Sequence, residues 1–383
     1  MQNGHMQRYL EGHIRQDLEK KIVLLSGPRQ VGKTTLSKQI WDSFVYLSYD
    51  SGPDREMLRK MEWDRNARLV IFDELHKMKN WKSWIKGVYD TRGIPPGILV
   101  TGSSRLDLVR KGGDSLAGRF FSYRLHPLTV REICALLPET PAEALENLLK
   151  LGGFPEPYLE KDENMARRWR LSHLDTIIRQ DLLDLEKIRD LKSIEILVDL
   201  LKSRVGSPVS HNALAGDLQI SPHTAKHWLE LLEGLCVIFA VRPYHRNIAR
   251  SILKEPKYYF YDIGAVEGGQ GAKLENAVAT ALLRELHFLE DTTGRKGHLH
   301  YLRDKEKNEV DFLVVLENRP CLMVEVKTDD DHFSKSIFHF QKRLPGVRSV
   351  QAVYQLERRK SSGDADMIGV DEFLRYLSFE KEK

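Results

Sequence analysis

The sequence predicts an α/β protein whose N-terminal part is built on a parallel β-sheet with crossover helices. Over residues 20–125, short apolar runs of strand length alternate with helical segments. A glycine-bearing turn follows the first run and precedes a helix. Beyond residue 250 the alternation of strands and helices begins again, which predicts a second α/β unit.

Length and composition limit the possible classes of protein. The chain has 383 residues, of which 41% are hydrophobic and 30% charged. A single core stops growing near ~250–300 residues, so we expect at least two domains. The formal net charge is only +4, so any nucleic-acid binding must depend on local patches. Three cysteines without CxxC spacing predict neither a disulfide framework nor a Cys-based zinc site.

No targeting or membrane segment is expected. The first twenty residues are polar and charged, and no run of eighteen apolar residues occurs in the chain. We therefore expect a cytoplasmic protein without a membrane partner.

The N-terminal elements follow from hydrophobic patterning. Residues 6–20 predict a short amphipathic helix, and the apolar run after it ends at Gly27-Pro28, where the next helix follows. Helical periodicity resumes after the strands, with a Gly/Pro hinge at residues 152–158. The expected strands are 21–26, 44–50, 68–74 and 97–104, and the later helices are 127–137, 142–152 and 163–185.

The rest of the chain divides into a helical and a strand-rich part. Residues 194–235 have the rhythm of a helix–turn–helix, with Pro222 at the start of its last helix, and residues 236–244 are the expected wing. A strand at 258–264 and a helix at 274–286 follow. Three strands in sequence are expected at 298–304, 309–316 and 321–327.

The most specific motif is a phosphate-binding loop. Gly27 to Thr34 matches G-x-x-x-x-G-K-[ST] at every fixed position, between a strand and a helix. The glycines let backbone N–H groups face phosphates, Lys33 reaches the β- and γ-phosphates, and Thr34 supplies an oxygen to Mg²⁺. A chance match in a turn is the minor alternative. The expected ATP-binding residues are Gly27, Pro28, Arg29, Gln30, Val31, Gly32, Lys33, Thr34 and Thr35.

Hydrolysis requires further groups at the same edge of the sheet. Asp73 ends an apolar strand and is expected to hold Mg²⁺, while Glu74 polarises the attacking water. Ser103 or Ser104 follows the next strand and is a candidate contact to the γ-phosphate, although serines there also form turns. Arg119 is the candidate arginine finger acting on a neighbouring subunit, with a structural role as the equal alternative. Arg105 and Arg124 compete for that role.

The order of these motifs resembles a known family. GPRQVGKTT, IFDELHK, LVTGSS, SLAGR and L-x-PLT-x-x-E follow one another as in AAA+-type ATPases of bacteria and archaea that carry a C-terminal domain of unknown function. The resemblance implies ATP and Mg²⁺ as ligands, a homo-oligomer, possible as a ring, and a C-terminal domain similar to PD-(D/E)xK nucleases. The implied domains are 1–126 for the ATPase core, 127–192 for a helical lid, 193–250 for a winged helix and 251–383 for the nuclease-like domain.

The C-terminal unit carries the acids that such nucleases use. Glu325 and Lys327 alternate on one strand and therefore share a face. With Asp311 and Glu275 they form a candidate oxygen site for Mg²⁺. A surface ion pair is the competing interpretation. The Tyr expected one turn after Gln341 is also missing, which counts against cleavage.

The helix–turn–helix is a candidate DNA reader. Its last helix presents polar and basic residues in its first turns, and further basic residues flank the motif. A packing or oligomerisation module is the alternative. The candidate DNA contacts are His223, Thr224, Lys226, His227 and Arg242.

Together these features predict an Mg²⁺-dependent ATPase coupled to DNA binding or processing. The alternatives are an ATP-dependent oligomeric switch or scaffold, or a protein remodeller, in which the nuclease-like domain does not cleave.

Overall fold

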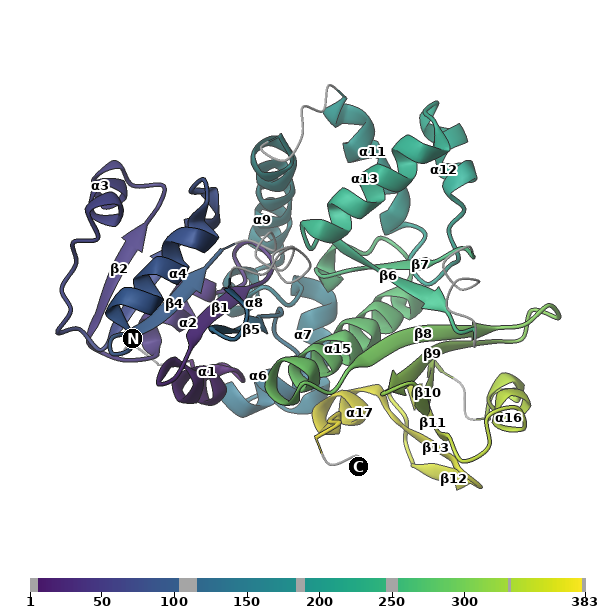
Figure 1. Ribbon diagram of the computed structural model, residues 1–383. Coiled ribbons are helices and arrows are strands. Elements are labelled where there is room, and N and C mark those ends of the chain that lie inside the picture. The colour runs from purple at the N-terminus through teal and green to yellow at the C-terminus, as the bar shows by residue number, and fades with distance from the viewer. Residues whose placement is uncertain (1–5, 103–115, 184–189, 246–253, 330–331, 381–383) are drawn as a thin grey trace. The chain divides into compact units, whose positions relative to one another are not determined.

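The chain forms two compact units, residues 1–126 and 127–383. The structure, a computed structural model, describes residues 6–102, 116–183, 190–245, 254–329 and 332–380. The first unit, purple to blue, holds one sheet with its helices, and the second, teal to yellow, holds a helical part and a second sheet (Figure 1). No helix in the described ranges is both long and apolar enough to cross a membrane.

The first unit contains a five-stranded parallel sheet in the order β2-β3-β4-β1-β5. The central strands are buried almost throughout, as expected for a parallel sheet covered on both faces. This confirms the predicted parallel α/β core. The strands are β1 (Ile22–Ser26), β2 (Phe44–Ser48), β3 (Leu69–Asp73), β4 (Gly97–Thr101) and β5 (Phe120–Arg124).

The helices of this unit connect its parallel strands. Ser51 begins α3 by accepting a hydrogen bond from the Asp54 N–H, at 3.4 Å. Phe72 of β3 lies edge-on to Trp63 and Trp84, with ring centroids 5.3 and 5.4 Å away. These contacts fix β3, whose end carries the predicted acids. The helices are α1 (Glu11–Leu18), α2 (Lys33–Gln39), α3 (Gly52–Lys60), the 3₁₀ turn η1 (Leu75–Lys77) and α4 (Trp81–Arg92).

The second unit begins with a helical part. Thr140 and Glu143 form a capping box at the start of α7. The helix expected over 163–185 is α9, which passes into a π-helical turn, η3, before residues outside the described ranges. These elements are α6 (Val130–Leu136), α7 (Pro141–Leu151), α8 (Pro155–Glu160), α9 (Glu163–Thr176) and η3 (Ile177–Leu182).

Three helices come next, at the positions expected for the helix–turn–helix. Ser221 accepts a hydrogen bond from the Thr224 N–H at 3.0 Å, and Pro222 occupies the first helical position. The helices are α11 (Leu191–Lys202), α12 (His211–Leu218) and α13 (Pro222–Gly234).

A mixed eight-stranded sheet in the order β12-β13-β11-β10-β9-β8-β6-β7 completes the second unit. The helix α15 (Gln270–Thr293) contacts several of its strands, and its inward face is buried along most of its length. The strands are β6 (Ile238–Pro243), β7 (Lys257–Phe260), β8 (Gly297–Arg303), β9 (Glu309–Leu316), β10 (Arg319–Lys327), β11 (Arg348–Val353), β12 (Lys360–Ser362) and β13 (Ala365–Gly369). The remaining elements are η4 (Ile263–Ala265), α16 (Lys335–Gln341) and α17 (Val370–Tyr376).

The strand expected to form a wing has a different position. β6 pairs antiparallel with β7 and parallel with β8, so it belongs to the same sheet as the C-terminal strands. The expected boundary between residues 250 and 251 therefore runs through a sheet. The pairing of β6 with β8 joins residues about sixty positions apart in the sequence, and local hydrophobic patterning does not reveal such a contact.

Candidate functional site

The phosphate-binding loop has a backbone that only glycine accommodates at its first position. Gly27 has φ +143°, and a Cβ there would lie 2.3 Å from the carbonyl oxygen of Leu125. Gly32 has φ +96° and immediately precedes α2. The loop is therefore held directly against the chain after β5, and its curvature depends on both glycines.

The two reactive side chains of the loop lie where the motif predicts. Lys33 is buried, and its Nζ donates to the carbonyl oxygens of Gly27 and Pro28 at 2.9 and 2.6 Å. The Thr34 hydroxyl donates to Asp73 Oδ2 at 3.5 Å. A hydroxyl and a carboxylate thus converge beside a buried ammonium group. Oxygen ligands of this kind suit Mg²⁺, and the ammonium suits phosphate.

The other expected ATP-binding residues line the same loop. Pro28 and Val31 are buried, Arg29 is half-buried, and Gln30 and Thr35 are exposed. Gln30 has φ +60°, a second left-handed turn of the backbone. Left-handed residues within such a turn point successive backbone N–H groups to one side, as anion-binding loops require.

Arg8 supports this loop and was not found from the sequence. Its buried guanidinium donates to the carbonyl oxygen of Val31 at 3.0 Å and to that of His126 at 2.7 Å. Arg8 thereby joins the phosphate-binding loop to the segment after β5. An arginine before an amphipathic helix gives no pattern that would single it out.

Asp73 lies at the carboxyl end of β3, between two hydroxyl donors. The Tyr46 hydroxyl, on β2, and the Thr101 hydroxyl, on β4, both donate to its carboxylate. Burial and the Asp73 charge raise the pKa of Tyr46. The carboxylate is thus oriented from both neighbouring strands, which the sequence did not reveal.

Glu74 follows Asp73 in a left-handed backbone conformation, with φ +55°. Its carboxylate lies 3.5 Å from Lys77 Nζ and 3.6 Å from His76 Nε2, and Lys77 also pairs with Asp50 at 2.7 Å. Burial raises the pKa of Glu74, the Lys77 charge opposes that rise and the Asp73 charge adds to it. A raised pKa favours a group that accepts a proton from water.

The remaining predicted residues of the first unit divide into two groups. Ser103, with Ser104 and Arg105, lies outside the described residues. Arg119 directly precedes β5, at the amino edge of the sheet, and pairs with Asp90 at 2.7 Å. The phosphate-binding loop follows β1 at the opposite edge, so Arg119 is not brought to the site of its own chain. Arg124 ends β5 beside Ser26, at the loop's edge.

The four candidate nuclease residues come together in the second unit. The Asp311 N–H donates to Glu325 Oε2 at 3.4 Å, and the Val326 N–H donates to Asp311 Oδ2 at 2.9 Å. Lys327 pairs with Glu325 at 2.8 Å. Glu275 reaches the same centre from α15. The structure thus brings together the four residues that the sequence grouped.

A buried lysine at the centre of this group was not anticipated. Lys257 of β7 has a side chain that is 1% exposed, and its Nζ lies 3.2 Å from Glu275, 2.7 Å from Glu309 and 3.6 Å from Asp311. Burial alone would lower the pKa of Lys257, but the three carboxylates outweigh it and raise that pKa. Burial, with the Asp311 charge, raises the pKa of Glu275 to about 7. We name this group the Lys257 centre.

The helix–turn–helix exposes some of the candidate DNA contacts. His223 and Lys226 are exposed on α13, His227 is half-buried, and Lys226 pairs with Glu230 at 3.8 Å. The Thr224 hydroxyl lies 2.8 Å from the capping Ser221 hydroxyl. Arg242 is half-buried on β6.

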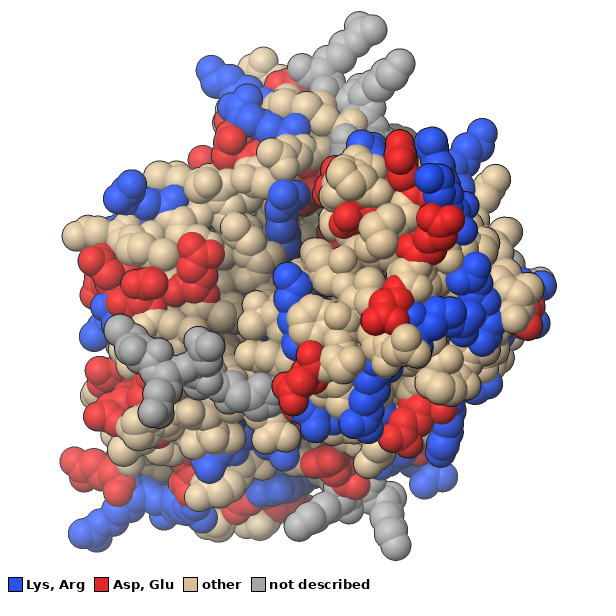
Figure 2. Space-filling view, turned by 90° about the vertical axis from the view of Figure 1, so that its left-hand side faces the viewer, with Lys and Arg blue, Asp and Glu red and all other residues tan. Residues whose placement is uncertain are grey.

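Acidic neighbours balance much of the flanking basic charge. Lys202 pairs with Asp199 and Arg204 with Asp217, each at 2.7 Å. These pairs reduce the local positive charge beside the helix–turn–helix. On the face shown in Figure 2, which is the left-hand side of Figure 1, Lys and Arg are interspersed with Asp and Glu.

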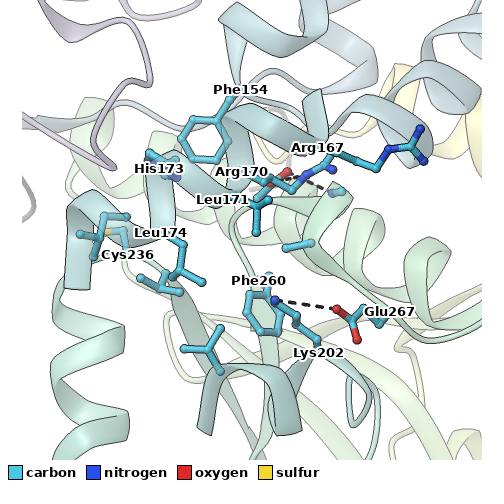
Figure 3. A pocket seen from close by; sticks show the side chains of 16 residues that line it. Phe154, Arg167, Arg170, Leu171, His173, Leu174, Lys202, Cys236, Phe260 and Glu267 are labelled. Carbon is cyan, nitrogen blue, oxygen red and sulfur yellow. Dashed lines mark hydrogen bonds and ion pairs between the residues drawn. The ribbon is translucent and has the colours of Figure 1, made fainter. Parts of the chain in front are cut away.

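A separate cavity of about 350 Å³ lies in the second unit (Figure 3). Apolar side chains from α9, α11 and β7, such as Leu174, Val198 and Phe260, line it. The charged side chains at its edge are largely paired, Arg170 with Asp262 at 2.9 Å and Lys202 with Glu267 at 3.8 Å. Arg170 also donates to the Leu151 carbonyl at 2.9 Å, so this pair joins α7, α9 and η4. The cavity wall is therefore held in part by the largely buried Arg170–Asp262 pair.

Three family models match successive parts of the chain. Residues 19–134 match "AAA domain", residues 142–268 match a "Domain of unknown function (DUF8612)" and residues 270–371 match a "Domain of unknown function (DUF4143)". The first match spans β1, the phosphate-binding loop, Asp73 and Glu74. The third contains all four acids around Lys257, namely Glu275, Glu309, Asp311 and Glu325.

Relatives that match most of the chain carry the description of uncharacterized proteins. One from Mycobacterium tuberculosis is 26% identical over 326 residues, covering 82% of this chain and 72% of that protein. One from Methanocaldococcus jannaschii is 25% identical over 375 residues, covering 88% and 82%. One from Haemophilus influenzae is 22% identical over 340 residues, covering 79% and 82%.

Solved structures show only distant similarity. A RuvB variant of Thermotoga maritima has a TM-score of 0.31 and 16% identity, covering 62% of this chain and 89% of that one. The Drosophila ORC bound to DNA has a TM-score of 0.24 and 13% identity, covering 66% and 81%. The motif geometry and the family match agree instead on the nature of residues 19–134. This part of the chain matches the AAA domain and has a P-loop core of that type.

Proposed function

We propose that this protein is an Mg²⁺-dependent ATPase that acts as a homo-oligomer and couples ATP hydrolysis to DNA binding or processing. The observation that carries the ATPase proposal is the convergence of Thr34 and Asp73, 3.5 Å apart, beside the buried Lys33. Thr34 and Asp73 would hold Mg²⁺, which neutralises charge on the β- and γ-phosphates.

The residues of the first unit have distinct parts in this reaction. Lys33 exchanges its loop carbonyl contacts for phosphate oxygens when ATP binds. Glu74 orients a water molecule and accepts its proton as the water oxygen bonds to the γ-phosphorus. The bond to the bridging oxygen breaks, and ADP and phosphate leave. Tyr46 and Thr101 keep the Asp73 carboxylate in position.

Steady-state ATPase measurements on the full chain test this assignment. Lys33→Ala should remove tight ATP binding, whereas Glu74→Gln should retain binding and lose turnover by about a hundredfold or more. Lys60→Ala is the matched control, since Lys60 is exposed on α3 away from the site. Undiminished turnover in both Lys33→Ala and Glu74→Gln would refute the proposal.

The oligomer proposal assigns Arg119 to the site of a neighbouring copy. Its position beside Asp90, away from the loop of its own chain, fits action on another chain, and the ion pair with Asp90 fits the alternative of a structural role. Mixing Arg119→Ala with Lys33→Ala chains should restore activity at interfaces that combine an intact loop with an intact Arg119. Full activity of Arg119→Ala alone would remove it from the reaction, leaving Arg105 and Arg124 as candidates.

The DNA part of the proposal depends on the exposed start of α13. His223 and Lys226 lie in the first turns, where recognition helices contact DNA. Duplex and single-stranded DNA should stimulate the ATPase, and Lys226→Glu should weaken binding and reduce its salt dependence. Exposed Lys60→Glu supplies the matched charge control. Stimulation by unfolded protein instead of DNA would favour a protein remodeller.

One observation favours the alternative of a slow switch or scaffold. The Glu74 carboxylate is held by Lys77 and His76 rather than directed freely at a water site. In that case ATP binding alone would change the assembly state, and Glu74→Gln would assemble like the unaltered protein. Sedimentation with ATP and with ADP separates this alternative from an ATPase whose assembly follows turnover.

A further inference from the structure

The Lys257 centre differs in one respect from an acidic site that awaits a metal ion. A divalent cation in a nuclease-like site binds carboxylate oxygens that converge on an open position. Here an ammonium group contacts three of the carboxylates, at 2.7 to 3.6 Å. It is almost completely buried, at 1% exposure, so it cannot move aside into solvent without opening the fold.

Further carboxylate oxygens of the centre, on Glu325 and Asp311, are also engaged. Glu325 pairs with Lys327 and accepts a hydrogen bond from the Asp311 N–H. Asp311 Oδ2 accepts one from the Val326 N–H, and Glu275 Oε1, which Lys257 contacts, also accepts one from the Tyr259 hydroxyl at 2.6 Å. Among the described residues, no group of three or more His, Cys, Asp or Glu side chains is arranged to hold a metal ion. The residues present therefore do not fit Mg²⁺.

The main chain before α12 also closes one side of the centre. A Cβ on Gly206 would lie 2.5 Å from Glu275 Oε2, so the backbone is directly against that carboxylate. Pro208 forms a β-bridge with Lys257, and the Val209 N–H donates to the Pro256 carbonyl at 2.8 Å. A phosphodiester approaching Glu275 from this side would meet the turn that leads into the helix–turn–helix.

We propose that Lys257 is the resident cation of this centre and takes the place of a divalent metal ion. The centre then serves as a structural joint between the helix–turn–helix and the C-terminal sheet, and it does not cleave phosphodiesters. A lysine ammonium supplies three N–H donors and one positive charge, enough to compensate buried carboxylates in a fixed geometry. The inference concerns the second unit alone and is independent of the ATPase proposal.

Removal of the ammonium group should expose the latent metal site. We would measure Mn²⁺ binding to the full chain by electron paramagnetic resonance, in an Asp73→Asn background that removes the carboxylate at the phosphate-binding loop. Lys257→Met should gain a Mn²⁺ site at least about tenfold tighter than any in the parent, because the carboxylates lose their cation. Mn²⁺ should also raise the Tm of Lys257→Met and not that of the parent.

Two further variants decide the interpretation. Adding Asp311→Asn to Lys257→Met should abolish the new site, and the exposed Lys254→Met should behave as the parent. A parent that binds Mn²⁺ in a manner abolished by Asp311→Asn would overturn the proposal, as would a folded Lys257→Met that gains no site. If Lys257→Met fails to fold, comparing the parent with Asp311→Asn decides alone. Equal Mn²⁺ binding by the parent and Asp311→Asn supports Lys257 as the resident cation. Weaker Mn²⁺ binding by Asp311→Asn than by the parent refutes it.

Discussion

Replacing Arg8 by Met should loosen the phosphate-binding loop without changing any residue that contacts nucleotide. Met retains much of the apolar stem but removes the guanidinium that bonds the Val31 and His126 carbonyls at 3.0 and 2.7 Å. A hydrogen bond to a charged group is worth about 1.5–3 kcal/mol, so two predict a loss of about 3–6 kcal/mol. We expect the lower value, about 3 kcal/mol, because freed loop carbonyls regain water.

Hydrogen exchange measured by mass spectrometry tests this locally. A loss of about 3 kcal/mol should speed exchange through local opening in peptides covering residues 27–40 by about a hundredfold. ATP affinity should fall as well, since a looser loop must be ordered on binding.

Arg15→Met is the matched control. Arg15 lies in α1, with a side chain that is 44% exposed, and pairs with Glu11 at 2.8 Å. Glu11 is buried, at 3% exposure, but Arg15 is open to solvent, which screens the pair, so we expect a contribution of about 1 kcal/mol. Equal exchange in the loop peptides of Arg8→Met and Arg15→Met would refute the reasoning.

Three further predictions follow from buried contacts. Gly27→Ala should abolish ATP binding, because its Cβ would lie 2.3 Å from the Leu125 carbonyl oxygen; wild-type affinity by calorimetry would contradict this. Asp262→Asn should lower the free energy of unfolding of the second unit by about 3 kcal/mol, since it leaves Arg170 without its buried partner; a change below about 1 kcal/mol in urea titration would contradict it. Burial lowers the pKa of His211 from 6.5. Between its native and unfolded pKa values the native state therefore binds fewer protons than the unfolded state, so stability should fall as the pH drops below about 6.5. His211→Gln should flatten that acid limb in thermal melts, and an unchanged limb would contradict the assignment.

The sequence predicted the parts of the protein that depend on local chemistry. The phosphate-binding loop requires glycine at fixed positions, and Asp73 follows a strand whose apolar character is continuous, so both leave a local pattern. The pairing of Glu325 with Asp311 followed from strand alternation, because neighbouring strands bring same-face residues together.

Contacts between distant residues were not predictable in this way. Lys257 is the first residue of the aromatic strand β7, where a lysine usually ends in solvent, and its partners lie between 18 and 54 positions further on. Arg8 acts on a carbonyl 23 residues away and on another 118 residues away. Burial of a charge is decided by the whole fold, and its compensation can come from any strand or helix nearby.

The shared strand β6 has a mechanical consequence for the helix–turn–helix. α13 passes through a short connection into β6, which is hydrogen-bonded on both edges, to β7 and to β8. At the other end of the segment, Val209 is fastened to Pro256. A force that a ligand exerts on α13 is therefore transmitted directly to the sheet. There it is distributed over the hydrogen bonds that β6 makes with β7 and β8. Reorientation of these helices would proceed by moving the sheet with them rather than by swinging on a flexible tether.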